Sequence, residues 1–159
     1  MNISILAVGK LKEDYLKAAV REYEKRLSRY ASVRIIELED EKCAENAGEK
    51  ERTLIKEKEG MRILSAIREK DRVIALAILG ESFSSEKMAE RLGKFMNNGQ
   101  TDLVFVIGGS LGLSDEVLKR ADERWSFSQL TFPHQLVRVI LLEQIYRSFR
   151  ILKNEPYHK

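Results

Sequence analysis

The sequence is poor in the residues that form disulfides and metal sites. Cys43 is the only cysteine among 159 residues, so no disulfide can form within the chain and no cysteine cluster can bind a metal. The only histidines are His134 and His158, and the segment around His134 has no spacing typical of metal ligands. We therefore expect no metal ion in this protein.

The chain also lacks the segments that direct a protein to a membrane or divide it into domains. No apolar run reaches membrane-spanning length without charges. The first eight residues are a short apolar run with no basic region before it, which is typical of a strand and not of a signal peptide. Only two prolines occur, and there is no Pro- or Gly-rich linker. We predict a single cytoplasmic domain over residues 1–159, with no membrane partner.

The composition favours a folded core. Hydrophobic residues make up 43% of the chain, and charged residues of both signs make up 33%. This balance argues against intrinsic disorder. The formal net charge of +3 is compatible with a nucleic-acid partner but does not demonstrate one, because binding depends on where the charges cluster.

Hydrophobic periodicity predicts strands that alternate with helices. Continuous apolar runs indicate buried strands, and apolar residues at helical spacing indicate the helices between them. The predicted strands are Asn2–Val8, Val33–Leu38, Val73–Leu79, Leu103–Ile107 and Trp125–Phe127. The predicted helices are Glu13–Tyr30, Arg52–Arg68, one from Ser84 or Ser85 to Asn97, a short one after Ser114, and Leu136–Leu152. The alternation indicates an α/β sandwich with a mainly parallel sheet.

A glycine-rich segment, VIGGSLGLS (residues 106–114), overlaps the end of a predicted buried strand and continues beyond it. Ligands bind beyond the carboxyl ends of parallel strands, so this segment is a candidate ligand loop. It also matches the G-x-S-x-G pattern of hydrolases, with Ser110 as nucleophile and only Asp122 and His134 available as the other triad members. A plain glycine turn from strand to helix is the alternative without a function.

The last predicted helix has apolar residues around most of its circumference, which indicates burial on several sides. Either a second subunit or the core of a monomer would bury them, and we predict a homodimer built largely on this helix. Thr131 and Pro133 are suited to the start of this helix. Its arginines and the following lysine form either a solvated basic face or contacts to RNA phosphates.

The chain ends on EPYHK (residues 155–159), which is either a frayed terminus or a functional tail. Tyr157 offers a stacking face, His158 carries an imidazole that can accept a proton, and Lys159 is a cation. These properties suit the handling of an RNA base.

Three segments in this order resemble the bacterial ribosomal RNA large subunit methyltransferase H family, a group of small SPOUT-superfamily proteins. They are VIGGSLGLS, SFSQLTFPHQLVRVILLEQIYRSFRI (residues 126–151) and EPYHK. The resemblance extends over the whole chain, including ILAVGKLKEDYLKAAVREYEKRL (residues 5–27). It implies a SPOUT-type α/β/α sandwich with a mainly parallel five- or six-stranded sheet. It also implies a C-terminal trefoil knot, an exception to the rule that protein chains are unknotted.

The resemblance further implies a homodimer that binds S-adenosylmethionine. Such proteins methylate N3 of a pseudouridine in 23S rRNA and act on assembled 70S ribosomes. The implied cofactor-binding positions are Leu76, Gly108, Phe127, Ser128, Gln129, Leu130, Thr131 and Phe132. The family often has lysine where this chain has Glu81, so a basic side chain is missing from that loop.

The candidate catalytic residues are His134, Tyr157 and His158: methyl transfer to N3 requires removal of the N3 proton, for which the two histidines are the candidates, while Tyr157 would stack on or orient the base. Neither the residues nor the resemblance selects one of them. The candidate RNA contacts are Arg138, Arg147, Arg150 and Lys159.

Two other functions compete with this one. The first is a small serine hydrolase that uses Ser110, although a chain of this length with five strands is small for the hydrolase sheet. The second is a non-enzymatic ribosome- or RNA-binding domain. Binding of S-adenosylmethionine would separate the methyltransferase from both.

Overall fold

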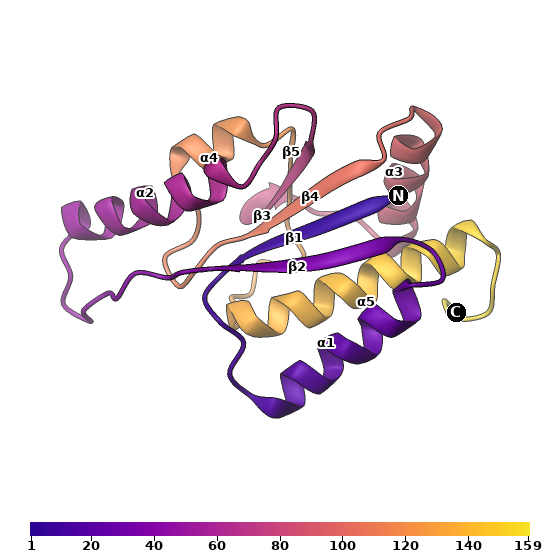
Figure 1. Cartoon of the computed structure of the whole chain (residues 1–159), viewed down its shortest axis with the longest axis horizontal. Helices are drawn as coiled ribbons and strands as arrows, with labels where there is room; N and C mark the ends of the chain where they lie inside the picture. Colours follow the sequence, from indigo (N-terminus) through magenta and orange to yellow (C-terminus); the bar gives the residue numbers. More distant parts are fainter.

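Five strands form the middle layer of the structure, and five helices cover its two faces (Figure 1). The computed structural model describes all residues from Met1 to Lys159. The strands are β1 (Asn2–Val8), β2 (Ser32–Leu38), β3 (Arg72–Glu81), β4 (Asp102–Ile107) and β5 (Glu123–Trp125). The helices are α1 (Asp14–Leu27), α2 (Glu49–Ser65), α3 (Ser85–Asn97), α4 (Asp115–Arg120) and α5 (His134–Leu152).

The sheet is parallel throughout, with the strand order β2-β1-β4-β3-β5. β4 lies between β1 and β3, so the chain returns to the middle of the sheet after β3 and then adds the edge strand β5. Because all strands run in one direction, their carboxyl ends lie at one edge of the sheet. The predicted α/β sandwich with a parallel sheet is confirmed, with five strands.

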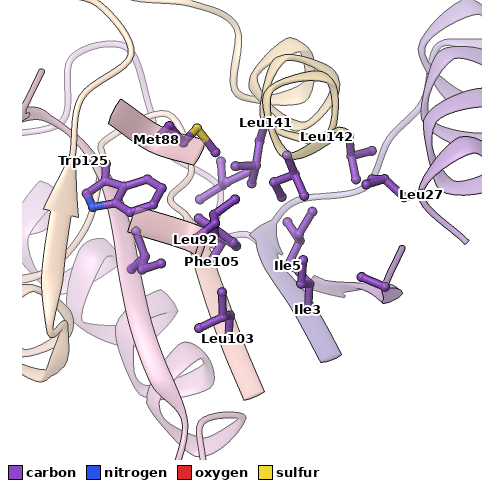
Figure 2. Packing of buried hydrophobic residues seen from close by; sticks show 14 of the residues in the cluster. Ile3, Ile5, Leu27, Met88, Leu92, Leu103, Phe105, Trp125, Leu141 and Leu142 are labelled. Carbon is purple, nitrogen blue, oxygen red and sulfur yellow. The ribbon is translucent and has the colours of Figure 1, made fainter. Parts of the chain in front are cut away.

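The side chains of the central strands alternate between two hydrophobic cores, as a period of two requires. Ile3, Ile5 and Phe105 belong to the larger core, under α1, α3 and α5 (Figure 2). Leu6 and Val106 belong to the smaller core, under α2 and α4. The continuous apolar runs in the sequence are therefore explained by burial on both faces of the sheet.

Most apolar side chains around α5 are buried in the core of their own chain. Leu141, Leu142, Ile145 and Phe149 are at most 3% exposed. The helix packs against both α1 and α3 (Figure 1). Of the two explanations that the sequence leaves open, burial inside one chain thus accounts for most of this helix.

The start of α5 differs from the prediction. The helix begins at His134, and Pro133 is its N-cap residue. No side chain caps it, so the predicted capping by Thr131 is wrong. The predicted caps of the two shorter helices are confirmed, since the hydroxyls of Ser84 and Ser114 accept the N–H groups three residues on.

β5 also differs from the prediction, because it covers Glu123–Trp125 and not Trp125–Phe127. After Trp125 the chain leaves the ladder, and the Ser126 N–H donates to the carbonyl of Glu81 at 2.9 Å. The residues that follow are therefore free to form an irregular segment above the carboxyl edge of the sheet.

Candidate functional site

A pocket of about 700 Å³ opens at the carboxyl edge of the sheet. Its walls come from the end of β3, from the loop after β4, and from the segment that joins β5 to α5. Most of the lining is apolar, and no Asp, Glu, Lys or Arg side chain belongs to it. Such a site suits a ligand with a flat ring that is held by backbone groups and apolar surfaces.

The pocket brings together seven of the eight predicted cofactor positions. These are Leu76, Gly108, Phe127, Ser128, Leu130, Thr131 and Phe132. Gln129 is exposed and does not line the pocket. The convergence of these positions is a property of the fold, whereas their contact with a cofactor stays a prediction.

The β3 wall is a bulge that the sequence does not reveal. β3 pairs with Trp125 at Leu76 and again at Glu81, so residues 77–80 leave the ladder between these two points. Ile78 and Leu79 on this bulge are 53% and 99% exposed, which corrects the prediction that this strand is buried to its end. At Gly80 a Cβ would lie 2.7 Å from the backbone carbonyl carbon of Trp125, so only glycine fits where β3 and β5 come this close.

The second wall is the glycine loop, which we define as residues 108–112. A Cβ at Gly108 would lie 2.8 Å from the carbonyl group of Gly112, because the loop folds back on itself there. Gly112 has a φ of 84°, a conformation that favours glycine. The glycines thus let the backbone form the wall of the pocket without intervening side chains.

The third wall is an irregular segment that small polar side chains stabilise. The Ser126 hydroxyl donates to the carbonyl of Ser128 at 3.1 Å, and the Ser128 hydroxyl accepts the Leu130 N–H at 2.9 Å. Beneath this segment Trp125 is fully buried and packs edge-on against Phe83 and Phe105. This side of the pocket therefore rests on a rigid aromatic base.

Of the three candidate catalytic residues, only His134 lies at the pocket. Burial, together with the nearby charge of Arg138, lowers the pKa of the His134 imidazole below its usual value of 6.5, and Asp40 acts in the opposite direction. The imidazole is therefore neutral at pH 7. A neutral imidazole can accept a proton.

The hydrolase triad considered above does not assemble. Ser110 and His134 both line the pocket, but Asp122 lies at the opposite edge of the sheet. There its carboxylate accepts the backbone N–H of Val73 at 2.7 Å, near the start of β3. The hypothesis of a serine hydrolase built on these three residues is therefore wrong.

Tyr157 lies on the side of α5, away from the pocket of its own chain. Its hydroxyl donates to Glu143 at 3.1 Å, and its ring packs edge-on against Tyr146. Burial raises the pKa of the Tyr157 phenol, so this group stays protonated. Glu143 follows His134 by nine residues, or about 13.5 Å at 1.5 Å per helical residue.

His158 is likewise held on its own chain. Its Nε2 lies 2.8 Å from Glu86 at the start of α3, and its Nδ1 lies 3.2 Å from the Arg147 guanidinium. The structure therefore gives the C-terminal tail a defined position, but not one at the pocket of the same chain.

Arg138 is not available to RNA, which corrects its predicted role. Its side chain is 1% exposed and forms an ion pair with Glu37 at 2.8 Å. It also donates to the carbonyl of Gly9 at 2.6 Å. The same Glu37 carboxylate accepts the Leu11 N–H at 2.9 Å, so Arg138 fixes the loop after β1 to α5.

Arg147 and Arg150 are partly buried and hold the tail. Arg147 pairs with Glu143 at 2.6 Å, while Arg150 pairs with Glu155 at 2.6 Å and donates to the carbonyl of Pro156 at 2.7 Å. Lys159, at the end of the chain, is exposed.

Two features of the site escape the sequence reasoning. One is the exposed apolar bulge of β3, for which the apolar run itself is the only signal. The other is Glu59, a buried carboxylate of α2 that packs beneath the glycine loop. Its signal in the sequence is a Glu-Gly pair among the apolar positions of a helix.

Glu81, where the family often has lysine, is exposed and pairs with Arg91 of α3, which lowers the pKa of the Glu81 carboxyl.

No group of three or more His, Cys, Asp or Glu side chains is placed to hold a metal ion. None of the helices is both long enough and apolar enough to span a membrane.

The family described as "Predicted SPOUT methyltransferase" matches residues 1–158 of this chain. The chain is 57% identical to Ribosomal RNA large subunit methyltransferase H of Clostridium kluyveri and 59% identical to that of Bacillus cytotoxicus. Both alignments span 159 residues and cover 100% of each chain. Among solved structures, a probable methylase family protein from Haemophilus influenzae Rd KW20 is similar over 96% of this chain, with a TM-score of 0.52 and 11% identity. This chain covers 66% of that protein, and at this identity the likeness supports the fold alone.

Proposed function

Because the chain belongs to the SPOUT methyltransferases, in the ribosomal RNA large subunit methyltransferase H family, we propose that it methylates N3 of a pseudouridine in 23S rRNA. The methyl donor is S-adenosylmethionine, and the substrate is the assembled 70S ribosome. The protein acts in the cytoplasm as a homodimer. The observation that carries the proposal is the single pocket in which seven implied cofactor positions meet.

The pocket fits the cofactor in its chemistry. Its volume of about 700 Å³ lies in the range of small-molecule sites. Apolar side chains such as Leu76 and Phe132 suit the adenine ring, and the glycine loop leaves backbone groups open to the ribose and the methionine part. When bound, the cofactor supplies a methyl group that its sulfonium has already activated.

The task left to the protein is alignment and removal of the N3 proton. N3 lies between two carbonyl groups, so a modest base is sufficient. His134 is the candidate base at the pocket of its own chain, because burial keeps its imidazole neutral. It accepts the proton on a ring nitrogen.

Tyr157 and His158 take part from the tail of a second subunit. Their distance from the pocket of their own chain leaves this as the route by which they reach a reaction site. In that arrangement Tyr157 stacks on the displaced pyrimidine, and His158 is the alternative base.

A second subunit is supported by apolar side chains at the pocket. Ile78, Leu79 and Leu130, which line it, are 53%, 99% and 69% exposed, and Leu136 at the start of α5 is 36% exposed. Such a patch on a small protein marks an interaction site. The dimer contact is thus proposed around the pocket and the first turns of α5, not along the whole helix.

Contacts to RNA phosphates are proposed for Lys159 and for the exposed parts of Arg147 and Arg150. Ribosome binding should then weaken as salt increases. A trefoil knot formed by the C-terminal segment is part of the same proposal.

Transfer of labelled methyl groups from S-adenosylmethionine tests the function. We expect incorporation into ribosomes that lack the modification, at N3 of a pseudouridine, and little incorporation into free 23S rRNA. Cofactor binding without methyl transfer to ribosomes or to free 23S rRNA would contradict the proposed substrate. Absence of cofactor binding would instead favour a non-enzymatic ribosome-binding domain.

A further inference from the structure

Glu59 is a buried carboxylate that lacks a full set of partners. The residue is only 4% exposed. Its Oε1 accepts the backbone N–H of Glu41 at 3.0 Å, whereas its Oε2 is buried without any hydrogen-bond partner. Buried charges in proteins are normally paired, so this oxygen calls for an explanation.

Glu59 lies directly beneath the glycine loop. A Cβ at Gly109 would lie 3.1 Å from the Oε2 of Glu59 and 3.4 Å from its Oε1. Gly109 itself lines the pocket. Gly109 therefore lies against the free carboxylate oxygen and also forms part of the wall of the ligand site.

The packing of α2 keeps the carboxylate in this position. At Gly60 a Cβ would lie 2.3 Å from the hydroxyl of Ser114, so α2 touches the residue that precedes α4, two positions after the glycine loop. Ser114 in turn caps α4 and is 4% exposed. The close approach of Gly60 to Ser114 thus fixes the part of α2 that carries Glu59 against this region.

The charges around Glu59 leave it without a cation. Burial raises the pKa of the Glu59 carboxyl, as do the negative charges of Asp40 and Glu41. Arg62 is the one nearby cation, and its guanidinium already binds Glu41 at 2.6 Å and the carbonyl of Glu39 at 2.9 Å. A cation brought close to this group would therefore be bound favourably.

The proposed cofactor carries two cationic groups, the sulfonium and the α-ammonium, and the pocket has no charged side chain in its lining. We propose that Glu59 is the negative counter-charge for these cationic groups, acting on the pocket across the backbone of Gly109, whose missing side chain lets the carboxylate pack against the loop. This inference rests on the proposed function. It makes Glu59 a positioning residue for the cationic end of the methyl donor.

Calorimetry with three ligands tests the inference. S-adenosylmethionine carries both cationic groups, S-adenosylhomocysteine keeps only the ammonium, and 5′-methylthioadenosine has neither. Glu59→Gln removes the charge and keeps an acceptor for the Glu41 N–H. Glu57→Gln is the matched control, because it removes a charge from the exposed side of the same helix.

We expect Glu59→Gln to weaken S-adenosylmethionine binding about tenfold, which is the scale of one charge interaction across a partly buried site. Binding of 5′-methylthioadenosine should not change, and Glu57→Gln should bind all three ligands like the wild type. An equal loss for S-adenosylhomocysteine would assign the effect to the ammonium, and a smaller loss would assign it to the sulfonium.

Two results would overturn the inference. One is unchanged S-adenosylmethionine binding in Glu59→Gln, and the other is an equal loss for all three ligands, which would mean that Glu59 only shapes the loop. If the wild type binds none of the ligands, the proposed function fails and not the assignment of Glu59 alone.

Discussion

At the scale of single residues, Gly108 has no room for a side chain. In Gly108→Val the added atoms would start 2.8 Å from the backbone of Gly112, so the loop would have to open. Overpacking of this kind costs about 1–3 kcal/mol, and we expect cofactor affinity to fall about tenfold or more. Calorimetry measures this loss.

Gly48→Ala is the matched control, because nothing lies within 4 Å of a Cβ at that position. It should bind the cofactor like the wild type. Wild-type affinity in Gly108→Val would show that the glycine loop is not part of the binding site.

His134 should make stability depend on pH. Its pKa is lowered in the folded protein, so the unfolded chain binds more protons once the pH falls below about 6.5. The contribution of a neutral His134 is therefore complete above that pH and is lost as the pH falls towards the folded-state pKa. Urea unfolding at a series of pH values measures it.

The difference in unfolding free energy between the wild type and His134→Asn isolates this effect from the other titrating groups. We expect the difference to be constant above pH 7 and to change below pH 6.5. A constant difference over the whole range would mean that folding does not perturb this imidazole.

At the scale of elements, Arg138 joins α5 to the ends of β1 and β2. Arg138→Met keeps most of the side-chain volume but removes the charged donor to Glu37, which keeps only the Leu11 N–H, and the side-chain donor to the Gly9 carbonyl. Hydrogen bonds to charged groups contribute about 1.5–3 kcal/mol each, and Glu37 is partly solvated, so we expect a loss of about 2 kcal/mol in unfolding free energy. Urea denaturation measures it.

Lys119→Met serves as the control for Arg138→Met, since Lys119 is an exposed cation with one surface ion pair. Its effect should be small, as is usual for such pairs. Equal stability of the two variants would contradict the structural role of Arg138.

The tail is a second element whose role can be separated from folding. Deletion of Pro156–Lys159 removes the contacts of Tyr157 and His158 but none of the residues in the two hydrophobic cores. We expect folding, dimerisation and cofactor binding close to wild type, and a collapse of methyl transfer to ribosomes. Full transfer activity in the shortened chain would make the tail a structural end.

At the scale of the whole molecule, the exposed bulge of β3 should decide the oligomeric state. Leu79 is 99% exposed beside the pocket, and Leu79→Glu would place a charge in the proposed subunit contact. We expect a dimer for the wild type and a folded monomer for this variant in sedimentation equilibrium at micromolar concentration.

Met61→Glu is the control for this variant. Met61 is also an exposed apolar residue, with 64% exposure, but it lies on α2, which covers the face of the sheet opposite α5. Met61→Glu should stay dimeric. A wild type that is monomeric at micromolar concentration would contradict the proposed homodimer. It would also contradict the proposed route by which the tail reaches the pocket of the partner subunit.

The sequence predicts the layers of this fold well because burial leaves a periodic signal. The apolar runs of β1 and β4 and the spaced apolar positions of α3 need only local patterns to be recognised. Seven of the eight cofactor positions that the resemblance implies meet in one pocket because carboxyl ends of parallel strands share an edge.

Other features depend on contacts that no local pattern encodes. Arginine is usually a surface residue, and only the approach of β1 and β2 to α5 shows that Arg138 is buried. Asp122 follows α4 directly in sequence, yet the direction of β3 puts it at the far edge from Ser110. The bulge at Leu79 depends on the pairing of Trp125 with two residues of β3.

The order in which the walls of the pocket occur along the chain has a consequence for biosynthesis. The first wall begins at Leu76, but the last one ends in α5, and β4 must enter between β1 and β3 before the sheet is complete. A nascent chain therefore cannot hold a ligand until nearly all of it has left the translation machinery. Prematurely terminated chains that lack α5 would lose Leu141 and Leu142 from the larger core as well, so they would be cleared as unfolded protein.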